Sequence, residues 1–282
     1  MKIAIVGAGR LAATLAPALF SAGHTLTEIV FHRDTSSLRR ARTLARKIGA
    51  RAVVAEDSEL NAKTIWFCVP DGKIRQAAAE LIGAGEWEGK IAFHSSGALA
   101  SDELNALRKR GAAVASVHPL MTFVSGSRPD LRGVPFALEG DRSAISVARQ
   151  ILNGFHAKPL VIRKQDKVLY HAWGTFASPL LIALLATTER VARASGVSIH
   201  AARERMLPIL NQTLANYAAL GPAKAFSGPI VRGDAEVLRR QLAALKKVPE
   251  ARKVYLALAR SALSFLPAQN RVELQKLFLI AH

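Results

Sequence analysis

A chain of 282 residues, half of them hydrophobic, is long enough for two domains and for a sizeable core. Its single cysteine, Cys68, excludes an intrachain disulfide and a zinc site built from cysteines. The formal net charge of +18 comes from scattered Lys and Arg residues, with no nucleic-acid motif or aromatic stacking platform among them, so we predict no nucleic-acid partner.

The first 162 residues alternate short apolar runs with helical segments. The apolar runs predict eight strands, at residues 2–6, 27–31, 52–55, 64–69, 91–94, 114–117, 135–138 and 158–162. Helices are predicted at residues 11–22, from a cap at Ser36 or Ser37 to Ile48, and at residues 74–82, 101–110 and 143–155. Strands that alternate with helices imply βαβ crossovers, and therefore a doubly wound α/β sheet.

After about residue 165 the strand pattern stops. Helices are predicted at residues 166–195, 199–220, 235–245, 250–266 and 269–280. This change of pattern predicts two domains, residues 1–162 and 163–282. The most apolar later stretch, residues 173–187, is shorter than the ~20 residues of a membrane span. The chain start is too quickly broken by glycine for a signal peptide, and we expect a cytoplasmic protein with no membrane partner.

The turn after the first strand matches the pattern G-x-G-x-x-G/A of dinucleotide-binding loops. The matching residues are Gly7, Ala8, Gly9, Arg10, Leu11 and Ala12. The match is informative because it follows a predicted strand and opens a predicted helix. The first glycine permits a tight turn, and the second lets the backbone approach a pyrophosphate at the positive end of the helix. We predict that residues 7–11 bind a dinucleotide.

The end of the second strand indicates which dinucleotide. An NAD site usually has an acidic residue there for the ribose hydroxyls, whereas an arginine accommodates the 2′-phosphate of NADP. Arg33 supplies such a guanidinium, with Ser36 as a helping hydroxyl, and Asp34 keeps the NAD alternative open. We predict NADP.

Several motifs give the chain a resemblance to a known family. They are His94-Ser95-Ser96-Gly97-Ala98-Leu99, residues 117–123 (VHPLMTF), Tyr170-His171-Ala172 and residues 227–234 (SGPIVRGD). The first half resembles the Rossmann domains of the 6-phosphogluconate dehydrogenase type, a group with pyrroline-5-carboxylate reductase and prephenate dehydrogenase. The whole chain more closely resembles a bacterial family of Rossmann-like proteins with a C-terminal domain of unknown function.

This resemblance implies an all-α second domain of the 6-phosphogluconate dehydrogenase type that often forms a homodimer. It also implies that Val69 and Pro70 lie along the nicotinamide ribose, and that residues 95–97 (Ser95, Ser96 and Gly97) close the reactive end of the cofactor. One departure concerns Ser178-Pro179, where relatives tend to carry Asn after the serine. If that amide assists catalysis in relatives, their chemistry does not carry over to this chain.

Two histidines are candidate proton donors or acceptors for hydride chemistry. Imidazole titrates near neutral pH, and ligands bind beyond the carboxyl ends of strands, where His118 lies. His171, Thr175 and Ser178 are spaced to share one helix face. We predict His171 as the acid/base, His118 as the second candidate, Ser178 as an assisting hydroxyl and Thr175 as a substrate contact. Either histidine can instead be structural, through helix packing or a turn fixed by His-Pro.

The turn-rich segment around residue 232 offers a group for a substrate carboxylate. Arg232 can form a bidentate pair with such a carboxylate, or an internal pair with Asp234 that holds the loop. No acid and histidine cluster at ligand spacing predicts a metal. The sequence thus predicts an NADP-dependent oxidoreductase acting on a small carbonyl, alcohol or imine substrate. A non-catalytic NADP-binding sensor or scaffold is the alternative.

Overall fold

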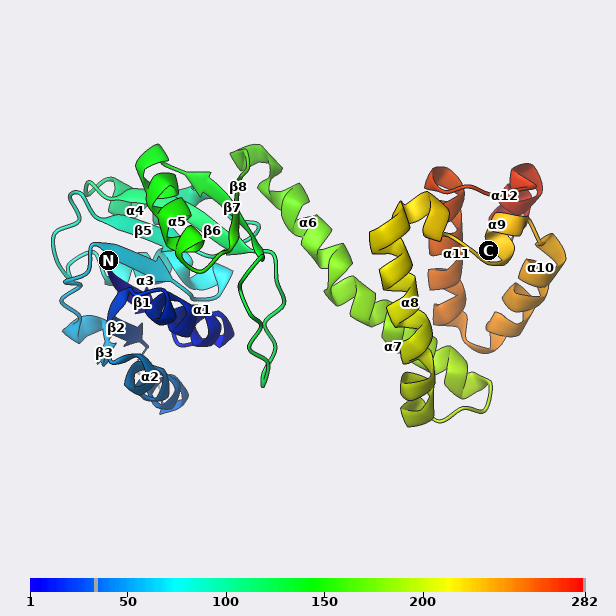
Figure 1. Cartoon of the computed structure of the whole chain (residues 1–282), viewed down its shortest axis with the longest axis horizontal. Helices are drawn as coiled ribbons and strands as arrows, with labels where there is room; N and C mark the ends of the chain where they lie inside the picture. Colours follow the sequence, from blue (N-terminus) through cyan, green and yellow to red (C-terminus); the bar gives the residue numbers. More distant parts are fainter. Residues whose placement is uncertain (33–34, 281–282) are drawn as a thin grey trace. The chain divides into compact units, whose positions relative to one another are not determined.

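The apolar runs of the first half form one eight-stranded sheet in the protein, whose computed structural model describes residues 1–32 and 35–280 (Figure 1). The spatial order of the strands is β3-β2-β1-β4-β5-β6-β7-β8. Their bounds are β1 (Lys2–Val6), β2 (Thr25–Phe31), β3 (Arg51–Val54), β4 (Thr64–Phe67), β5 (Ile91–His94), β6 (Ala113–Pro119), β7 (Pro135–Gly140) and β8 (Lys158–Val161). The order reverses between β1 and β4, and such a switch point is where doubly wound sheets bind ligands.

Helices cover both faces of this sheet. They are α1 (Arg10–Ser21), α2 (Thr35–Ile48), α3 (Ile74–Glu80), α4 (Asn105–Arg108) and α5 (Arg142–Gly154). Side chains alternate along β1: Ile3 and Ile5 pack with residues of α1, α2 and α5, whereas Ala4 and Val6 pack with residues of α3 and α4. The predicted doubly wound fold is therefore confirmed.

Two details of the first half differ from the predicted pattern. The strand β7 runs antiparallel to β6 and parallel to β8, so the segment between β6 and β7 is not a helical crossover. The helix predicted at residues 101–110 begins as a 3₁₀ turn (Ser101–Leu104) and is α-helical only in α4. Short 3₁₀ turns also occur at Ala55–Asp57, Asp71–Lys73, Lys164–Asp166 and Leu245–Lys247.

The chain divides into two compact units, residues 1–177 and 178–282. The first unit extends beyond the predicted boundary at residue 162 because it includes α6 (Lys167–Ala177), whose first residue is buried against the sheet. The second unit is helical, as predicted. Its helices are α7 (Pro179–Ala194), α8 (Ile199–Ala225), α9 (Pro229–Arg232), α10 (Ala235–Ala244), α11 (Pro249–Phe265) and α12 (Arg271–Ile280).

Two helix breaks follow from proline and glycine. The helix predicted at residues 166–195 is interrupted at Ser178, which has non-helical angles (φ −128°, ψ −80°) directly before Pro179. A residue before proline is disfavoured in the α region, and proline itself donates no backbone hydrogen bond. In α8 the same kind of break occurs at Gly221, which precedes Pro222 and has φ 73° and ψ 172°.

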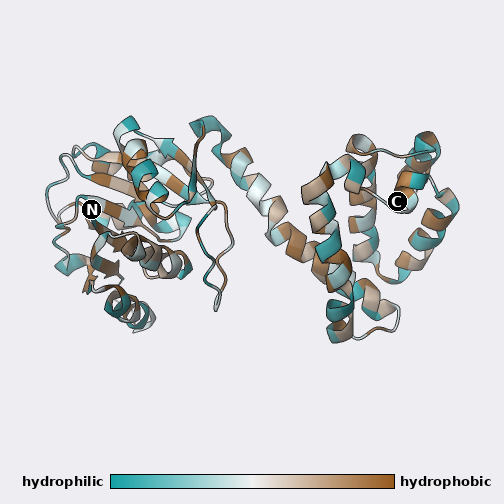
Figure 2. Cartoon of the chain, in the orientation of Figure 1, coloured by the Kyte–Doolittle hydropathy of each residue, from teal (hydrophilic) through white to brown (hydrophobic). Residues whose placement is uncertain are grey.

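Residues 164–194 are, by length and composition alone, apolar enough to cross a membrane, and none of their most apolar window is buried within the structure. This stretch is longer than the apolar segment predicted from the sequence. Figure 2 shows hydrophobic segments recurring along these helices and along α8. One such helix is weak evidence for a membrane span. Exposed apolar side chains of this kind are also typical of a surface that contacts another protein.

Candidate functional site

The turn between β1 and α1 has a backbone path that requires glycine. Gly7 has φ +103°, and a Cβ built on it would lie 2.6 Å from the carbonyl oxygen of Cys68. Its N–H donates to the carbonyl of Val30 at 2.8 Å, so the turn is held between the two neighbouring strands. Gly9 then caps the N-terminus of α1. A close-approach glycine turn followed by a helix start fits a diphosphate, as the sequence predicts.

A cavity of about 560 Å³ opens beside this turn at the switch point of the sheet. The structure brings the turn together with Val69 and Pro70, which follow β4 and line the same cavity; their place along a nicotinamide ribose stays a prediction. The cavity is lined by residues 6–9, 30–32, 37, 40, 55, 56, 68–70, 73, 76, 77, 80 and 81. It is mixed in polarity, with backbone at the glycine turn and charged side chains from α2 and α3.

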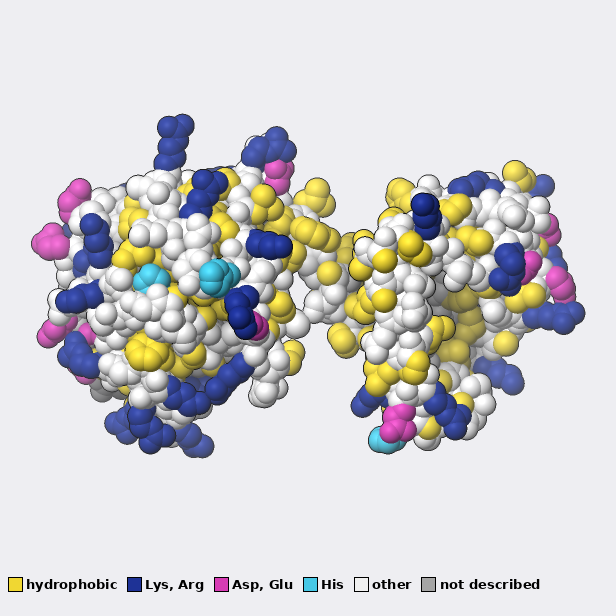
Figure 3. All heavy atoms as spheres, viewed as in Figure 1, with side chains coloured by type: hydrophobic (Ala, Val, Ile, Leu, Met, Phe, Trp, Pro, Cys, Tyr) yellow, Lys and Arg dark blue, Asp and Glu magenta, His cyan; other side chains and the backbone are white. Residues whose placement is uncertain are grey.

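The α2 side of this cavity is basic. Arg40 donates from Nη2 to the hydroxyl of Ser37 at 3.2 Å, and both residues line the cavity. The sequence analysis did not single out Arg40, which lies about one helical turn after Ser36 on α2. Ser36 is exposed, and Arg33 lies outside the described residues. Figure 3 shows Lys and Arg side chains gathered over α2.

The other predicted residues of the turn play smaller parts in the structure. Arg10 is exposed and donates from Nη1 to the carbonyl of Phe123 at 3.4 Å. Leu11 packs against the hydrophobic core on the α1 side of the sheet. Burial raises the pKa of the Cys68 thiol to about 12, so this cavity-lining cysteine is a neutral thiol.

The segment after β5 is fixed by a polar network. Ser95 Oγ accepts from Trp66 Nε1 at 2.8 Å. Ser96 Oγ donates to Asp71 Oδ2 at 2.7 Å and accepts from the N–H of Leu99 at 2.9 Å. Because Asp71 directly follows Pro70 of the cavity, this network ties Ser96 to the segment that lines the cavity.

The two predicted histidines meet at Gly97. The ring centroids of His118 and His171 lie 5.7 Å apart at an interplanar angle of 75°. A Cβ built on Gly97 would lie 2.8 Å from His118 Nε2 and would also clash with Cδ2 of His171. Glycine at this position therefore lets the segment pass beneath both rings, and the histidines of β6 and α6 share one site within the first unit.

The hydrogen bonds of His118 define its tautomer. Its Nδ1 lies 3.0 Å from the carbonyl oxygen of Ser95, which can only accept, so Nδ1 carries the proton and Nε2 presents a lone pair. Burial lowers the pKa of His118, the hydrogen bond to the Ser95 carbonyl opposes this effect, and the positive charge of Lys167 lowers the pKa further. His118 is thus a neutral imidazole in this site. His94 is also neutral, because burial lowers its pKa to about 4.

Lys167 is a functional candidate that the sequence reasoning missed. Its side chain is 1% exposed, and its ammonium donates to Ser116 Oγ at 2.7 Å and to the carbonyl of Ser96 at 3.3 Å. In the sequence it is one more lysine at the start of an exposed helix. Only its burial in the structure distinguishes it from the others.

Three predicted residues are not brought into this cluster. The hydroxyl of Thr175 donates to the carbonyl of His171 on its own helix at 3.1 Å. Ser178 is the break before α7 and belongs to the second unit. Arg232 forms the internal ion pair with Asp234, at 2.8 Å, that the sequence left as an alternative to carboxylate binding. Their predicted roles toward a substrate stay predictions.

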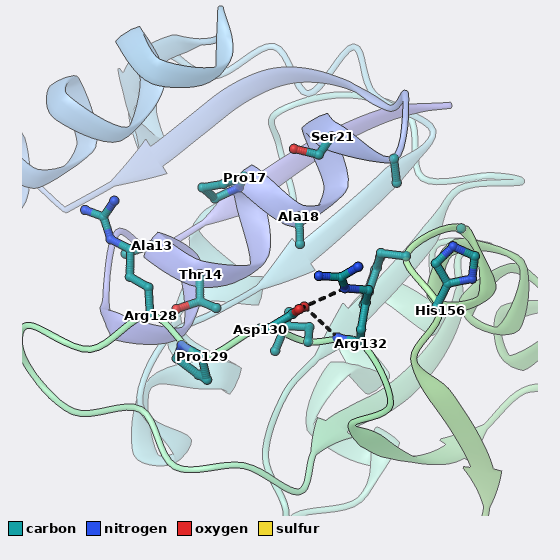
Figure 4. Close-up of a pocket in the computed structure, with 14 residues that line it drawn as sticks. Ala13, Thr14, Pro17, Ala18, Ser21, Arg128, Pro129, Asp130, Arg132 and His156 are labelled. Atoms are coloured by element: carbon teal, nitrogen blue, oxygen red, sulfur yellow. Dashed lines mark hydrogen bonds and ion pairs between the residues drawn. The ribbon is translucent and has the colours of Figure 1, made fainter.

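A second cavity, of about 480 Å³, lies between α1, the connection that precedes β7 and the end of α5 (Figure 4). Arg128, Arg132 and His156 line it, but Arg132 is paired with Asp130 at 2.8 Å. None of the predicted site residues lines this cavity. The combination of the glycine turn with the histidine cluster therefore defines the candidate site.

Comparisons with known proteins agree with this division of the chain. Residues 1–119 match the model of a Rossmann-like domain, and residues 134–262 match that of DUF2520, a domain of unknown function. No curated protein matches the chain by sequence.

Three solved structures illustrate the fold. A Bacteroides fragilis protein named provisionally as an NADP oxidoreductase is 21% identical, with a TM-score of 0.74, and the match covers 92% of this chain and 96% of that one. A Thermotoga maritima protein is 22% identical, with a TM-score of 0.72 and coverage of 99% and 98%. An imine reductase variant from Myxococcus stipitatus, in complex with NAD⁺, is 17% identical, with a TM-score of 0.59 and coverage of 99% of each chain. At these identities the likeness shows a shared fold.

Proposed function

Because this chain joins a Rossmann-like domain to a DUF2520 domain, we propose that it is an NADP(H)-dependent oxidoreductase acting on a small carbonyl, alcohol or imine substrate. The observation that carries the proposal is the glycine turn at the switch point of the sheet, together with His118 near the carboxyl end of β6 and His171 on α6. The resemblance in fold to reductases of imines supports the reaction class.

The residues of the cavity fit a bound dinucleotide. The N–H groups at the start of α1 would hold its diphosphate, in a turn that needs glycine at position 7 because the Cys68 carbonyl leaves no room for a Cβ. Arg33, Ser37 and Arg40 would hold the 2′-phosphate of NADP. When bound, the nicotinamide supplies or accepts the hydride.

The chain's own contribution to the reaction is the movement of a proton at the substrate oxygen or nitrogen. We assign this step to His171, whose ring stands over Gly97 beside His118. His118, with Nδ1 bound to Ser95, presents a neutral Nε2 that accepts a hydrogen bond from the substrate or from His171. For a substrate carboxylate, Arg232 stays the proposed partner, and its internal pair with Asp234 would have to open to release the guanidinium.

The experiment that tests this function is a screen of NADPH oxidation with keto acids and cyclic imines, and of NADP⁺ reduction with the matching alcohols and amines. Turnover of at least one class is expected. Tight NADPH binding without turnover of any member would favour a sensor or scaffold instead. Absence of affinity for either nicotinamide dinucleotide would remove the whole proposal.

The choice of NADP over NAD predicts a selective effect at Arg33. In Arg33→Ala, NADPH affinity should fall by about tenfold or more, since a charge-assisted contact to a phosphate is lost, while NADH affinity is retained. The measurement is the quenching of protein fluorescence on titration with each dinucleotide. Arg40→Ala should act in the same direction, because Arg40 lines the same cavity.

Arg46→Ala is the matched control on α2, since Arg46 does not line the cofactor cavity. It should leave both affinities unchanged. Equal losses for NADPH and NADH in Arg33→Ala would contradict a 2′-phosphate contact and restore the NAD alternative that Asp34 keeps open.

We also propose that the protein is a cytoplasmic homodimer. The exposed apolar side chains of α6, among them Leu169 (76% exposed) and Phe176 (72%), are too many for a free surface in water. The second unit contains an apolar cavity of about 680 Å³ lined by α7, α10 and α11, and Figure 3 shows hydrophobic side chains in a hollow beside α8. A second copy would cover such surfaces.

Light scattering on the purified protein should give a mass of two chains, and Leu169→Asp with Phe176→Asp should reduce it to one. A wild-type mass of one chain at micromolar concentration would exclude the dimer. Recovery of the protein only with detergent would favour the membrane instead.

A further inference from the structure

The burial of the Lys167 ammonium costs desolvation free energy, which its two hydrogen bonds alone do not compensate. Taking an ammonium out of water is unfavourable by several kcal/mol unless charges and hydrogen bonds compensate it. Lys167 is the first residue of α6 and could point to solvent like Lys164, which is exposed and pairs with Asp102. A methionine or leucine would fill the same space without that cost, so the charge itself has a use.

The ammonium and His118 hold two successive carbonyls of one segment. His118 Nδ1 donates to the carbonyl of Ser95 at 3.0 Å. Lys167 Nζ donates to the carbonyl of Ser96 at 3.3 Å, and the hydroxyl of Ser116, which accepts from Lys167, donates to the same carbonyl at 3.0 Å. The segment that passes beneath both histidines is therefore fixed from β6 and α6 at once.

The charged and titratable groups around this pair come from four elements. Asp71 lies after β4, Glu139 on β7, His94 on β5, and Tyr170 and His171 on α6 itself. Asp71 is bonded to Ser96 Oγ, and Glu139 is bonded to the backbone and hydroxyl of Ser101, so neither carboxylate is bonded to Lys167 in the described chain. Burial lowers the pKa of Lys167 to about 8, and the two carboxylates oppose that effect, so the side chain is mainly charged at neutral pH.

We propose that Lys167 is a positioning residue of the reaction centre: its buried ammonium holds the Ser96 carbonyl and keeps the neighbouring His118 in its neutral form. A positive charge beside the imidazole disfavours a second positive charge there. His118 then keeps Nδ1–H on Ser95 and Nε2 as an acceptor facing Gly97 and His171. This inference rests on the proposed function for its role, but the charge coupling itself is independent of any substrate.

The test is the titration of His118, followed by NMR through the imidazole Cε1–H signal of the full-length protein without substrate. The His118 signal is assigned by its absence in His118→Asn. In Lys167→Met the midpoint should shift to higher pH, because the like charge is gone. Lys167→Gln should give the same upward shift while retaining a donor for the Ser96 carbonyl, and it keeps the test open if the methionine variant does not fold.

Two controls separate charge from packing. Lys167→Arg retains the positive charge and should keep the wild-type midpoint, which a purely structural role would not predict. Lys164→Met removes an exposed lysine close by in the sequence and should also leave His118 unchanged. An unshifted midpoint in a folded Lys167→Gln or Lys167→Met protein would overturn the proposal.

The pH dependence of turnover is a second readout, and its outcome is independent of the NMR titration. If the proposed reaction is found, the acidic limb of its pH profile should move to higher pH in Lys167→Gln and stay in place in Lys167→Arg. If no reaction is found, the NMR titration still decides whether Lys167 sets the charge of His118. A shifted midpoint without turnover would retain the coupling and remove only the proposed function.

Discussion

Replacing His171 by Ala is expected to lower the turnover number by roughly 10²–10⁴-fold, the usual contribution of a positioned acid or base. NADPH affinity should be nearly unchanged, because His171 stands over Gly97 and does not line the cofactor cavity. The measurement pairs steady-state kinetics on the best substrate of the screen with a dinucleotide titration of the same protein.

His200→Ala is the matched control for this substitution, since His200 is exposed on α8 and pairs with Glu204 at 3.7 Å. It should retain wild-type turnover. Full activity in His171→Ala would move the proton transfer to His118, the second candidate, and His118→Asn would then carry the large loss. Retained activity in both variants would remove the histidine cluster from the chemistry.

Substituting Gly7 by Ala should lower the free energy of unfolding by about 2 kcal/mol or more and dinucleotide affinity by about tenfold or more. Two causes act together. The residue must adopt φ +103°, and its new Cβ would stand 2.6 Å from the Cys68 carbonyl, so the turn has to move away from the diphosphate position. Thermal denaturation and an NADPH titration measure the two effects separately.

Gly23→Ala is the control that separates the effect of backbone strain from that of a steric clash. Gly23 has φ +81°, but a Cβ built on it would have no neighbour within 4 Å, and it lies outside the cofactor cavity. It should lose stability by about 1–2 kcal/mol from the backbone alone and keep its NADPH affinity. Unchanged dinucleotide binding in a folded Gly7→Ala protein would show that the turn does not hold the diphosphate.

The fold could be predicted from local sequence signals, because its strands are short apolar runs bounded by turns. The direction of β7 could not. Residues 120–134 are long enough for a crossover but lack a helical pattern. Because the crossover between parallel strands is usually an α-helix, the sequence contained a hint against a parallel strand there. The break before Pro179 could also be foreseen, since proline restricts the residue that precedes it.

The site could be predicted only where a motif encodes backbone geometry. Gly7 and Gly9 stand in a pattern with a known physical reason, whereas Lys167 depends on contacts with Ser96 and Ser116, far away in the chain. Burial of a single charged residue at the start of a helix leaves no periodic signal. The strand end and the helix face predicted His118 and His171 as two separate candidates, whereas their contact over Gly97 is visible only in the structure.

Because the Cys68 side chain is a neutral thiol, it is protected from oxidation. Only a thiolate attacks alkylating agents and peroxides, and a buried thiol with a pKa near 12 forms almost none in the cell. The sulfur that lines the cavity beside the glycine turn is thereby kept from oxidation. In the proposed oxidoreductase no oxidised form of this sulfur would arise to consume electrons, so the hydride would pass between cofactor and substrate alone.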